Sequence, residues 1–92
     1  MDWNSSLLEE KYALSILWII RNNPNMTKTD IVRVDKGGEK TKYAMINKLI
    51  DAGLVSTYSD ESMRWNTEYL ILTEKGKTVA EHIEIINEAM KN

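Results

Sequence analysis

The segment from Glu39 to Val55 constrains the fold of this chain more than any other. Apolar residues recur in it at three- and four-residue intervals up to Gly53, and strand-forming residues begin directly afterwards at Leu54. This spacing predicts an amphipathic helix over residues 39–52. Gly53 suits the left-handed position that ends many helices. The sequence therefore predicts a helix that passes into a strand without an intervening loop.

The residues that follow predict a β-hairpin and a last helix. Residues 54–59 and 65–72 are rich in strand formers, and the polar residues 60–64 between them are typical of a turn. Thr73 can cap a helix that continues to about Lys91.

Two more helices are predicted upstream. Ser6, with Glu9 three residues later, is a capping-box pattern and predicts a helix from Ser6 to about Asn22, which Pro24 ends. Thr27 can cap a short second helix over residues 28–34. The paired glycines at 37 and 38 predict the turn into the helix that starts at Glu39.

Length and composition narrow the possible functions. A chain of 92 residues forms one domain, so we take 1–92 as a single unit. The absence of cysteine excludes disulfides, thiolate metal sites and a cysteine nucleophile. With one histidine and no phosphate-binding glycine loop, we expect neither an enzyme nor a cofactor.

The longest apolar run, residues 16–20, is too short to cross a membrane, and the start of the chain lacks the basic residues of a secretory signal. We therefore expect a cytoplasmic protein.

The order of these elements predicts the fold class. Three helices, a hairpin and a last helix make a mainly helical α+β domain of the winged helix-turn-helix type, with residues 39–52 as recognition helix and the hairpin as wing. The net charge of the chain is −2, yet residues 25–58 hold six basic and four acidic residues. The mildly basic part therefore coincides with the recognition helix, which favours DNA as the partner.

The outward face of the predicted recognition helix supplies the candidate DNA contacts. Lysines can neutralise phosphates, threonine and asparagine can bond to base edges or phosphates, and a small alanine lets the helix sit deep in the groove. The candidates are Lys40, Thr41, Lys42, Ala44, Asn47 and Lys48, with Arg64 in the wing. Two acids at 60 and 61 oppose a phosphate contact by the wing. The alternative interpretation is that the lysines only keep an exposed helix solvated.

The last helix carries two apolar stripes. One holds Val79, Ile83, Ile86 and Met90, and the other holds His82, Ile85 and Ala89. Two stripes in so small a domain favour one for the core and one for a second copy of the chain. We therefore predict a homodimer through residues 73–91, with both stripes as candidates; packing only onto the first helix is the alternative. His82 is interpreted as a packing residue and not as a metal ligand.

Two motifs resemble those of known regulators. Residues 49–55 (Leu-Ile-Asp-Ala-Gly-Leu-Val) resemble the exit of the recognition helix in winged-helix transcriptional regulators, and residues 69–77 (Tyr-Leu-Ile-Leu-Thr-Glu-Lys-Gly-Lys) resemble their wing exit. The chain is similar to small archaeal or bacterial proteins of the Sso10a-like type, and more loosely to the MarR and HxlR groups. The resemblance implies a dimeric DNA-binding regulator, most simply a repressor that blocks a promoter.

Two other functions fit the same sequence. Winged-helix domains also dock proteins, which suits the acidic balance, and some bind DNA without sequence preference as architectural proteins. Neither the DNA site nor a small-molecule effector can be identified from the sequence.

Overall fold

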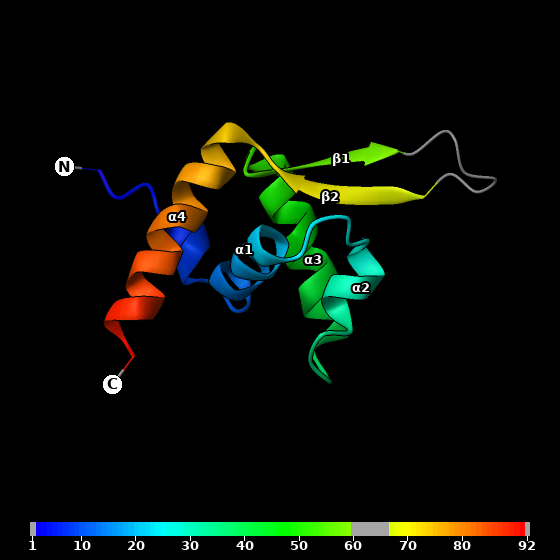
Figure 1. The fold of residues 1–92 in the computed structure, drawn as a ribbon, viewed down its shortest axis with the longest axis horizontal. Helices are drawn as coiled ribbons and strands as arrows, with labels where there is room; N and C mark the ends of the chain where they lie inside the picture. The colour runs from blue at the N-terminus through cyan, green and yellow to red at the C-terminus, as the bar shows by residue number, and fades with distance from the viewer. Residues whose placement is uncertain (1, 60–66, 92) are drawn as a thin grey trace.

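A computed structural model describes residues 2–59 and 67–91 (Figure 1). The chain order is a 3-10 turn η1 (Ser6–Glu9), helices α1 (Ala13–Asn22), α2 (Lys28–Val32) and α3 (Glu39–Asp51), strands β1 (Val55–Ser59) and β2 (Glu68–Leu72), and helix α4 (Glu74–Ala89). The predicted winged helix-turn-helix order is confirmed.

The prediction of one continuous helix from Ser6 to Asn22 is wrong. η1 ends at Glu9, and α1 begins only after Tyr12, whose φ of 71° is left-handed and breaks the helical path. The residue before η1 is Ser5, and it makes no side-chain cap. Because of this break, η1 does not continue α1, and its Leu7 and Leu8 are partly buried against the core.

The later helix boundaries follow their local signals. Thr27 and Asp30 form the reciprocal capping box at the start of α2, and Thr73 accepts a hydrogen bond from the amide of Gly76 at the start of α4. Gly53, with φ of 77°, follows α3 as predicted, and the Leu54 amide donates to the Leu49 carbonyl over 3.0 Å. α2 ends at Val32, two residues earlier than predicted.

The two strands form an antiparallel hairpin that is anchored to the helices. Val55 pairs with Leu72 and Ser59 with Glu68. Leu70, buried on the inner face, also donates its amide to the Met26 carbonyl over 2.9 Å, which ties β2 to the connection between α1 and α2. The candidate wing residue Arg64 lies outside the described residues.

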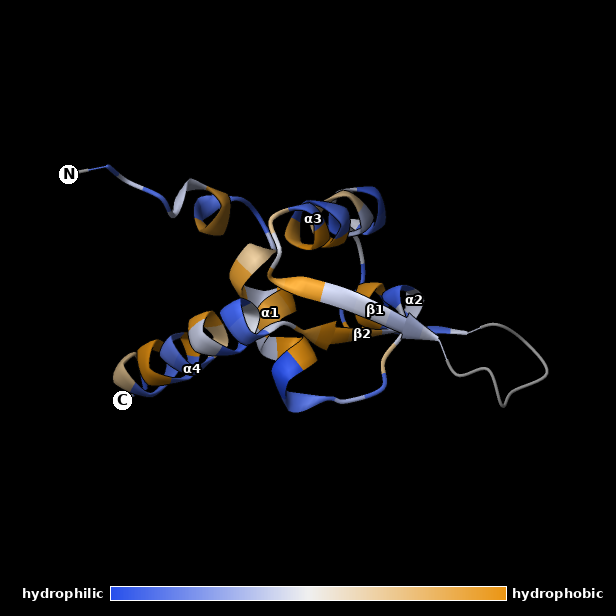
Figure 2. Ribbon diagram, turned by 90° about the horizontal axis from the view of Figure 1, so that it is seen from above, coloured by the Kyte–Doolittle hydropathy of each residue, from blue (hydrophilic) through white to orange (hydrophobic). Residues whose placement is uncertain are grey.

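α1 lies between α4 on one side and α2 and α3 on the other (Figure 1), and its apolar face is the centre of the core. Apolar segments of α1, α3 and β2 turn toward one another (Figure 2). Of the predicted inward face of α3, Ile46 and Leu49 are fully buried, whereas Tyr43 and Ile50 are half-buried. The remaining places are taken by Met45 and Lys42.

α4 packs on α1 and β2 through small residues. Gly76 and Ala80 are buried, and a side chain at Gly76 would overlap the Leu54 carbonyl oxygen, with the carbonyl carbon at 2.9 Å. This close approach requires glycine in the first turn of α4. None of the helices described is long and apolar enough to cross a membrane.

Candidate DNA-binding surface

α3 presents an exposed polar face. Lys40, Thr41, Ala44, Asn47 and Lys48 are all exposed, as the helical period predicts. The apolar side of the helix, with Met45, Ile46 and Leu49, holds it on the core. α3 therefore presents five of the six candidate side chains to solvent on a rigid element.

Lys42 is the exception, and the prediction that it points outward is wrong. Its side chain is only 5% exposed, and its ammonium group donates to the carbonyl oxygens of Asp35 at 2.7 Å and Val32 at 3.3 Å. The same group lies 5.2 Å from the centre of the Tyr12 ring. Periodicity missed this because lysine has a long apolar stem that can be buried while its charged end finds carbonyl partners.

Two hydrogen bonds fix α2 on α3 beside the exposed face. The Lys28 ammonium donates to the Asn47 side-chain oxygen at 3.0 Å, and the hydroxyls of Thr29 and Tyr43 are 3.1 Å apart. Lys28 thereby adds a positive charge to the surface around Asn47. Sequence reasoning did not include Lys28, because no pattern within α2 shows which side of α3 the helix will pack against.

Lys48 lies at the opposite edge of the face, where it is paired with an acid. Its ammonium group is 2.6 Å from the Glu10 carboxylate, and both side chains are substantially exposed. Glu10 belongs to the break between η1 and α1, so the N-terminal segment reaches the recognition helix. A phosphate would have to compete with this carboxylate for Lys48.

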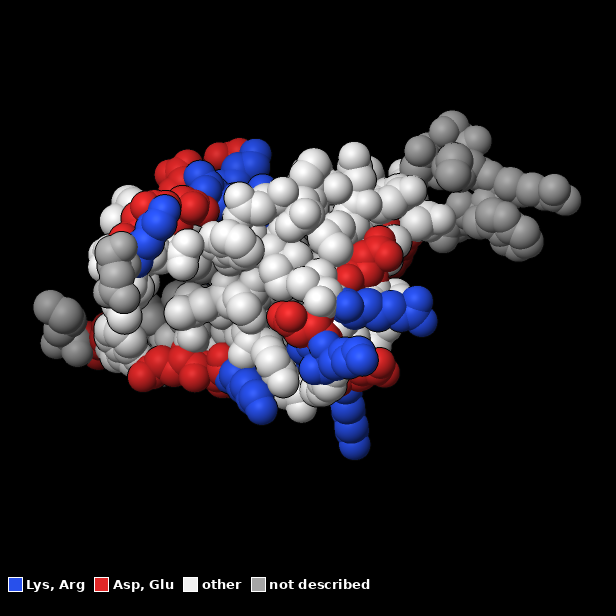
Figure 3. Space-filling model, turned by 60° about the horizontal axis from the view of Figure 1, so that its bottom comes forward, with Lys and Arg blue, Asp and Glu red and all other residues white. Residues whose placement is uncertain are grey.

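The charge around the helix-turn-helix is mixed. Basic side chains project from the part of the molecule that carries α2 and the turn into α3, with acidic ones among them (Figure 3). Arg33, Lys36 and Lys40 are exposed there, and so are Asp35 and Glu39. Because Lys42 is buried and Lys48 is paired, the accessible positive charge is smaller than the sequence indicates.

The stripes of α4 divide between core and solvent. Ile83 is 8% exposed and Val79 packs against the core, whereas Ile86 and Met90 of the same stripe are 54% and 78% exposed. Ile85 is also exposed. The expectation that His82 is a packing residue is wrong: it is exposed, with Nδ1 2.8 Å from the Thr78 carbonyl oxygen.

An apolar groove runs between α1 and α4. It encloses about 370 Å³ and is lined by Leu14, Ser15, Trp18, Ile83, Ile86, Asn87 and Met90. At its edge, the Trp18 indole and the Arg21 guanidinium both donate to the same oxygen of Glu84, each at 3.1 Å. This bond network fixes α4 on α1 and leaves the apolar side of the groove open.

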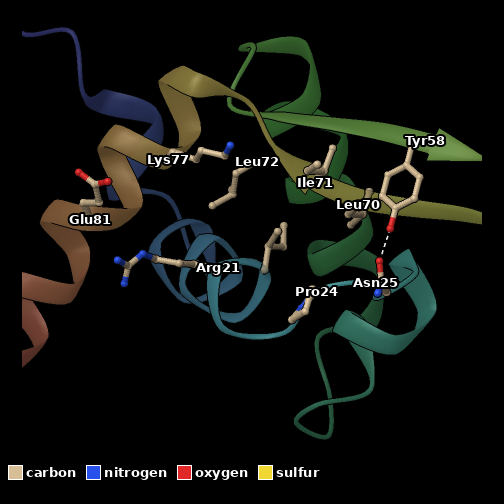
Figure 4. Close-up of a pocket in the computed structure, with 10 residues that line it drawn as sticks. Arg21, Pro24, Asn25, Tyr58, Leu70, Ile71, Leu72, Lys77 and Glu81 are labelled. Atoms are coloured by element: carbon tan, nitrogen blue, oxygen red, sulfur yellow. Dashed lines mark hydrogen bonds between the residues drawn. The ribbon is translucent and has the colours of Figure 1, made fainter.

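A second hollow, of about 360 Å³, lies between the end of α1, β2 and α4 (Figure 4). Leu70, Ile71 and Leu72 line it with apolar side chains, and Arg21, Lys77 and Glu81 give it charge on the α1 and α4 sides. At its far end the Tyr58 hydroxyl donates to the Asn25 side-chain oxygen, so the hairpin is joined to the α1–α2 connection. Within the described part of the chain, no three His, Cys, Asp or Glu residues are grouped to hold a metal ion.

The architecture of a helix-turn-helix, an exposed polar α3 and a hairpin wing is that of the winged-helix transcriptional regulators. A possible HxlR family transcriptional factor from Thermoplasma volcanium GSS1 superposes with a TM-score of 0.80 and 25% identity, over 97% of this chain and 79% of that one. A MarR protein from Peptoclostridium difficile superposes with a TM-score of 0.71 and 28% identity, over 88% of this chain and 53% of that one. The transcriptional regulator SlyA superposes with a TM-score of 0.75 and 24% identity, over 86% of this chain and 55% of that one.

This chain thus spans most of the HxlR-type neighbour but little more than half of the other two. No protein-family model matches the sequence, and no curated protein matches it significantly. The predicted resemblance to HxlR and MarR regulators is confirmed in structure, whereas a specific likeness to the Sso10a-like type stays a prediction.

Proposed function

We propose that this protein is a DNA-binding transcriptional regulator that places α3 in the major groove. The observation that carries the proposal is the exposed face of α3, where Lys40, Ala44 and Asn47 lie together on one side of the helix and Lys28 joins them from α2. The regulators with the same fold support it.

Each side chain on this face has a role in the proposed mechanism. Lys40 and Lys28 neutralise phosphates and set the register of the helix, while Asn47 and Thr41 reach base edges or phosphates. Ala44 adds little bulk, so the helix can approach the base pairs closely. Lys48 contributes once DNA displaces Glu10.

We propose that the regulator is a homodimer formed through α4. Ile86 and Met90, at the C-terminal end of α4, line the apolar groove together with Leu14 and Trp18, and Ile85 is exposed as well. Joining these apolar surfaces would remove them from water and place two α3 helices in successive major grooves. Such a dimer covers a promoter and represses transcription in the simplest case, acting in the cytoplasm where bacterial and archaeal DNA lies.

A labelled mixed-sequence duplex, followed by fluorescence anisotropy at low and at physiological salt, tests the proposal. We expect binding at low salt that weakens steeply as salt rises, because lysine contacts release counterions from DNA. A clear preference in a subsequent selection from random duplexes would separate a specific regulator from an architectural protein.

No binding at low salt would contradict the proposal and favour the protein-interaction module. The acidic residues beside the basic ones, Asp35 and Glu39 among them, are the observation that supports this second candidate.

A further inference from the structure

We propose that Lys42 is a positioning residue for DNA binding, which sets the start of the recognition helix from inside the protein without touching DNA. The inference rests on the proposed function. It gives a role to the buried charge of Lys42, which is not part of the exposed face of α3. It replaces the role of phosphate contact that the sequence suggested for this lysine.

The hydrogen bonds of Lys42 join α3 to the end of α2. Val32 is the last residue of α2, and a carbonyl at a helix end has no partner within its own helix. Asp35 lies in the turn between the two helices. By donating to both carbonyls, the ammonium group fixes the turn from which α3 begins.

Tyr12 also contacts the place where α2 turns into α3, and we call this meeting of Tyr12, Lys42 and the α2–α3 turn the junction. Its ring lies under the Lys42 ammonium, and it packs so closely on Gly38, the residue before α3, that a Cβ at Gly38 would lie 2.8 Å from the ring carbon that bears the hydroxyl. Tyr12 and Gly38 both have positive φ values, 71° and 66°. Non-glycine residues adopt this conformation at a cost, so surrounding contacts must hold Tyr12 in place.

These contacts bring three segments to one point: the η1–α1 break, the end of α2, and the first turn of α3. Lys40 and Thr41 precede Lys42 in that first turn and point outward. A change in the junction therefore moves candidate DNA-contacting side chains, although Lys42 itself remains inside. The salt dependence of binding distinguishes a positioning role for Lys42 from a phosphate contact, because only a phosphate contact contributes to that dependence.

The test compares Lys42→Met with Lys40→Ala in anisotropy titrations at several salt concentrations. Methionine keeps the length and helix propensity of lysine but removes its charge and donors. We expect Lys42→Met to weaken binding about tenfold, because the first turn of α3 is no longer fixed in the binding orientation, at an unchanged slope of log K against log salt. Lys40→Ala should make that negative slope shallower by about 0.9.

A conservative variant and a double mutant separate positioning from general damage. Lys42→Arg retains the cation and its donors, although its guanidinium is larger and planar, and should bind more tightly than Lys42→Met. Because Lys42 and Tyr12 belong to one junction, the losses of Lys42→Met and Tyr12→Leu should be clearly less than additive in the double variant. Circular dichroism confirms that each variant is folded at the temperature of the titration.

A shallower salt slope for Lys42→Met, matching that of Lys40→Ala, would show a phosphate contact and overturn the proposal. Parent-like affinity of a folded Lys42→Met would overturn it as well. If that variant does not fold, Tyr12→Leu replaces it: weaker binding at an unchanged slope supports the junction, and unchanged binding refutes it.

If the parent itself binds no duplex, the proposed function fails, and amide hydrogen exchange then decides the structural part. Exchange in residues 33–41 should be faster in Lys42→Met than in the parent if Lys42 holds the junction. Equal exchange rates would mean that Lys42 does not position α3.

Discussion

Single side chains decide how much of the α3 face is available to DNA. Lys40 is exposed, and among the described residues it takes part in no salt bridge, whereas Lys48 is paired with Glu10. We therefore expect the two lysines to contribute differently to DNA binding, although both lie on the exposed face of α3.

Lys40→Ala should weaken duplex binding and make the negative slope of log K against log salt shallower by about 0.9, because one phosphate contact is lost. The free energy of unfolding should change by less than about 0.5 kcal/mol, as for other exposed substitutions. Anisotropy titrations over a range of salt, together with urea unfolding, measure both. Lys91→Ala, two residues after the end of α4, is the control and should bind as the parent does.

Glu10→Gln should strengthen duplex binding two- to fivefold at low salt. The carboxylate that occupies Lys48 becomes neutral, and an exposed ion pair of this kind is worth about 0.5–1 kcal/mol. Combining it with Lys48→Ala provides the control, since the gain should then disappear. A gain that persists without Lys48 would point to a general effect of net charge.

At the scale of the elements, short connections hold the recognition helix and the wing in register. α3 passes into β1 through Gly53, and the Thr73 hydroxyl donates to the Gly53 carbonyl at 2.6 Å, so the start of α4 is bound to the end of α3. The Leu54 carbonyl then accepts the Thr73 amide, at the place where Gly76 packs closest. The junction of these elements has no room for additional atoms.

Gly76→Ala should therefore destabilise the protein by about 1–3 kcal/mol, since a methyl group must push the Leu54 carbonyl away. The sign is informative, because alanine in an unobstructed helix would stabilise it by about 1 kcal/mol relative to glycine. Urea unfolding measures the change. Lys77→Ala, one residue on and exposed, should lie within about 0.5 kcal/mol of the parent. Stabilisation by Gly76→Ala would mean that α4 is not seated against Leu54 in solution.

At the scale of the whole molecule, α4 connects the domain to its proposed second copy. It packs on α1 and β2 through Gly76, Ala80 and Ile83, whereas Ile85, Ile86 and Met90 toward its C-terminal end are exposed. Both termini lie at the α4 side of the molecule, away from the hairpin (Figure 1). A partner on α4 would leave the face of α3 free for DNA.

Ile86→Glu and Ile83→Asp should separate association from folding. Ile86→Glu places a charge on an exposed position of α4 and should give a folded monomer, because a charge in an apolar interface is strongly unfavourable. Ile83→Asp places the charge in the core and should unfold the chain. Sedimentation velocity reports the mass, and circular dichroism reports the fold. An unchanged dimer with Ile86→Glu would exclude this part of α4 from the interface.

Most elements of the fold follow from signals that are local in the sequence. The capping residues Thr27 and Thr73, the helix end at Gly53 and the strand-forming residues of the hairpin each act within a few residues, so the order of helices and strands, and hence the fold, was predictable. The exposed face of α3 followed from the helical period for five of the six candidate residues.

The neighbours that those residues meet could not be predicted, because they depend on how distant segments pack. Lys42 is buried because Tyr12 and the end of α2 surround it, and Lys48 is paired because the η1–α1 break brings Glu10 to it. Ile83 of the α4 stripe packs in the core, whereas Ile86 and Met90 of the same stripe are exposed. Each of these depends on contacts between segments distant in sequence. Periodicity records which side of a helix is apolar, but it does not contain the position of the segment that packs there.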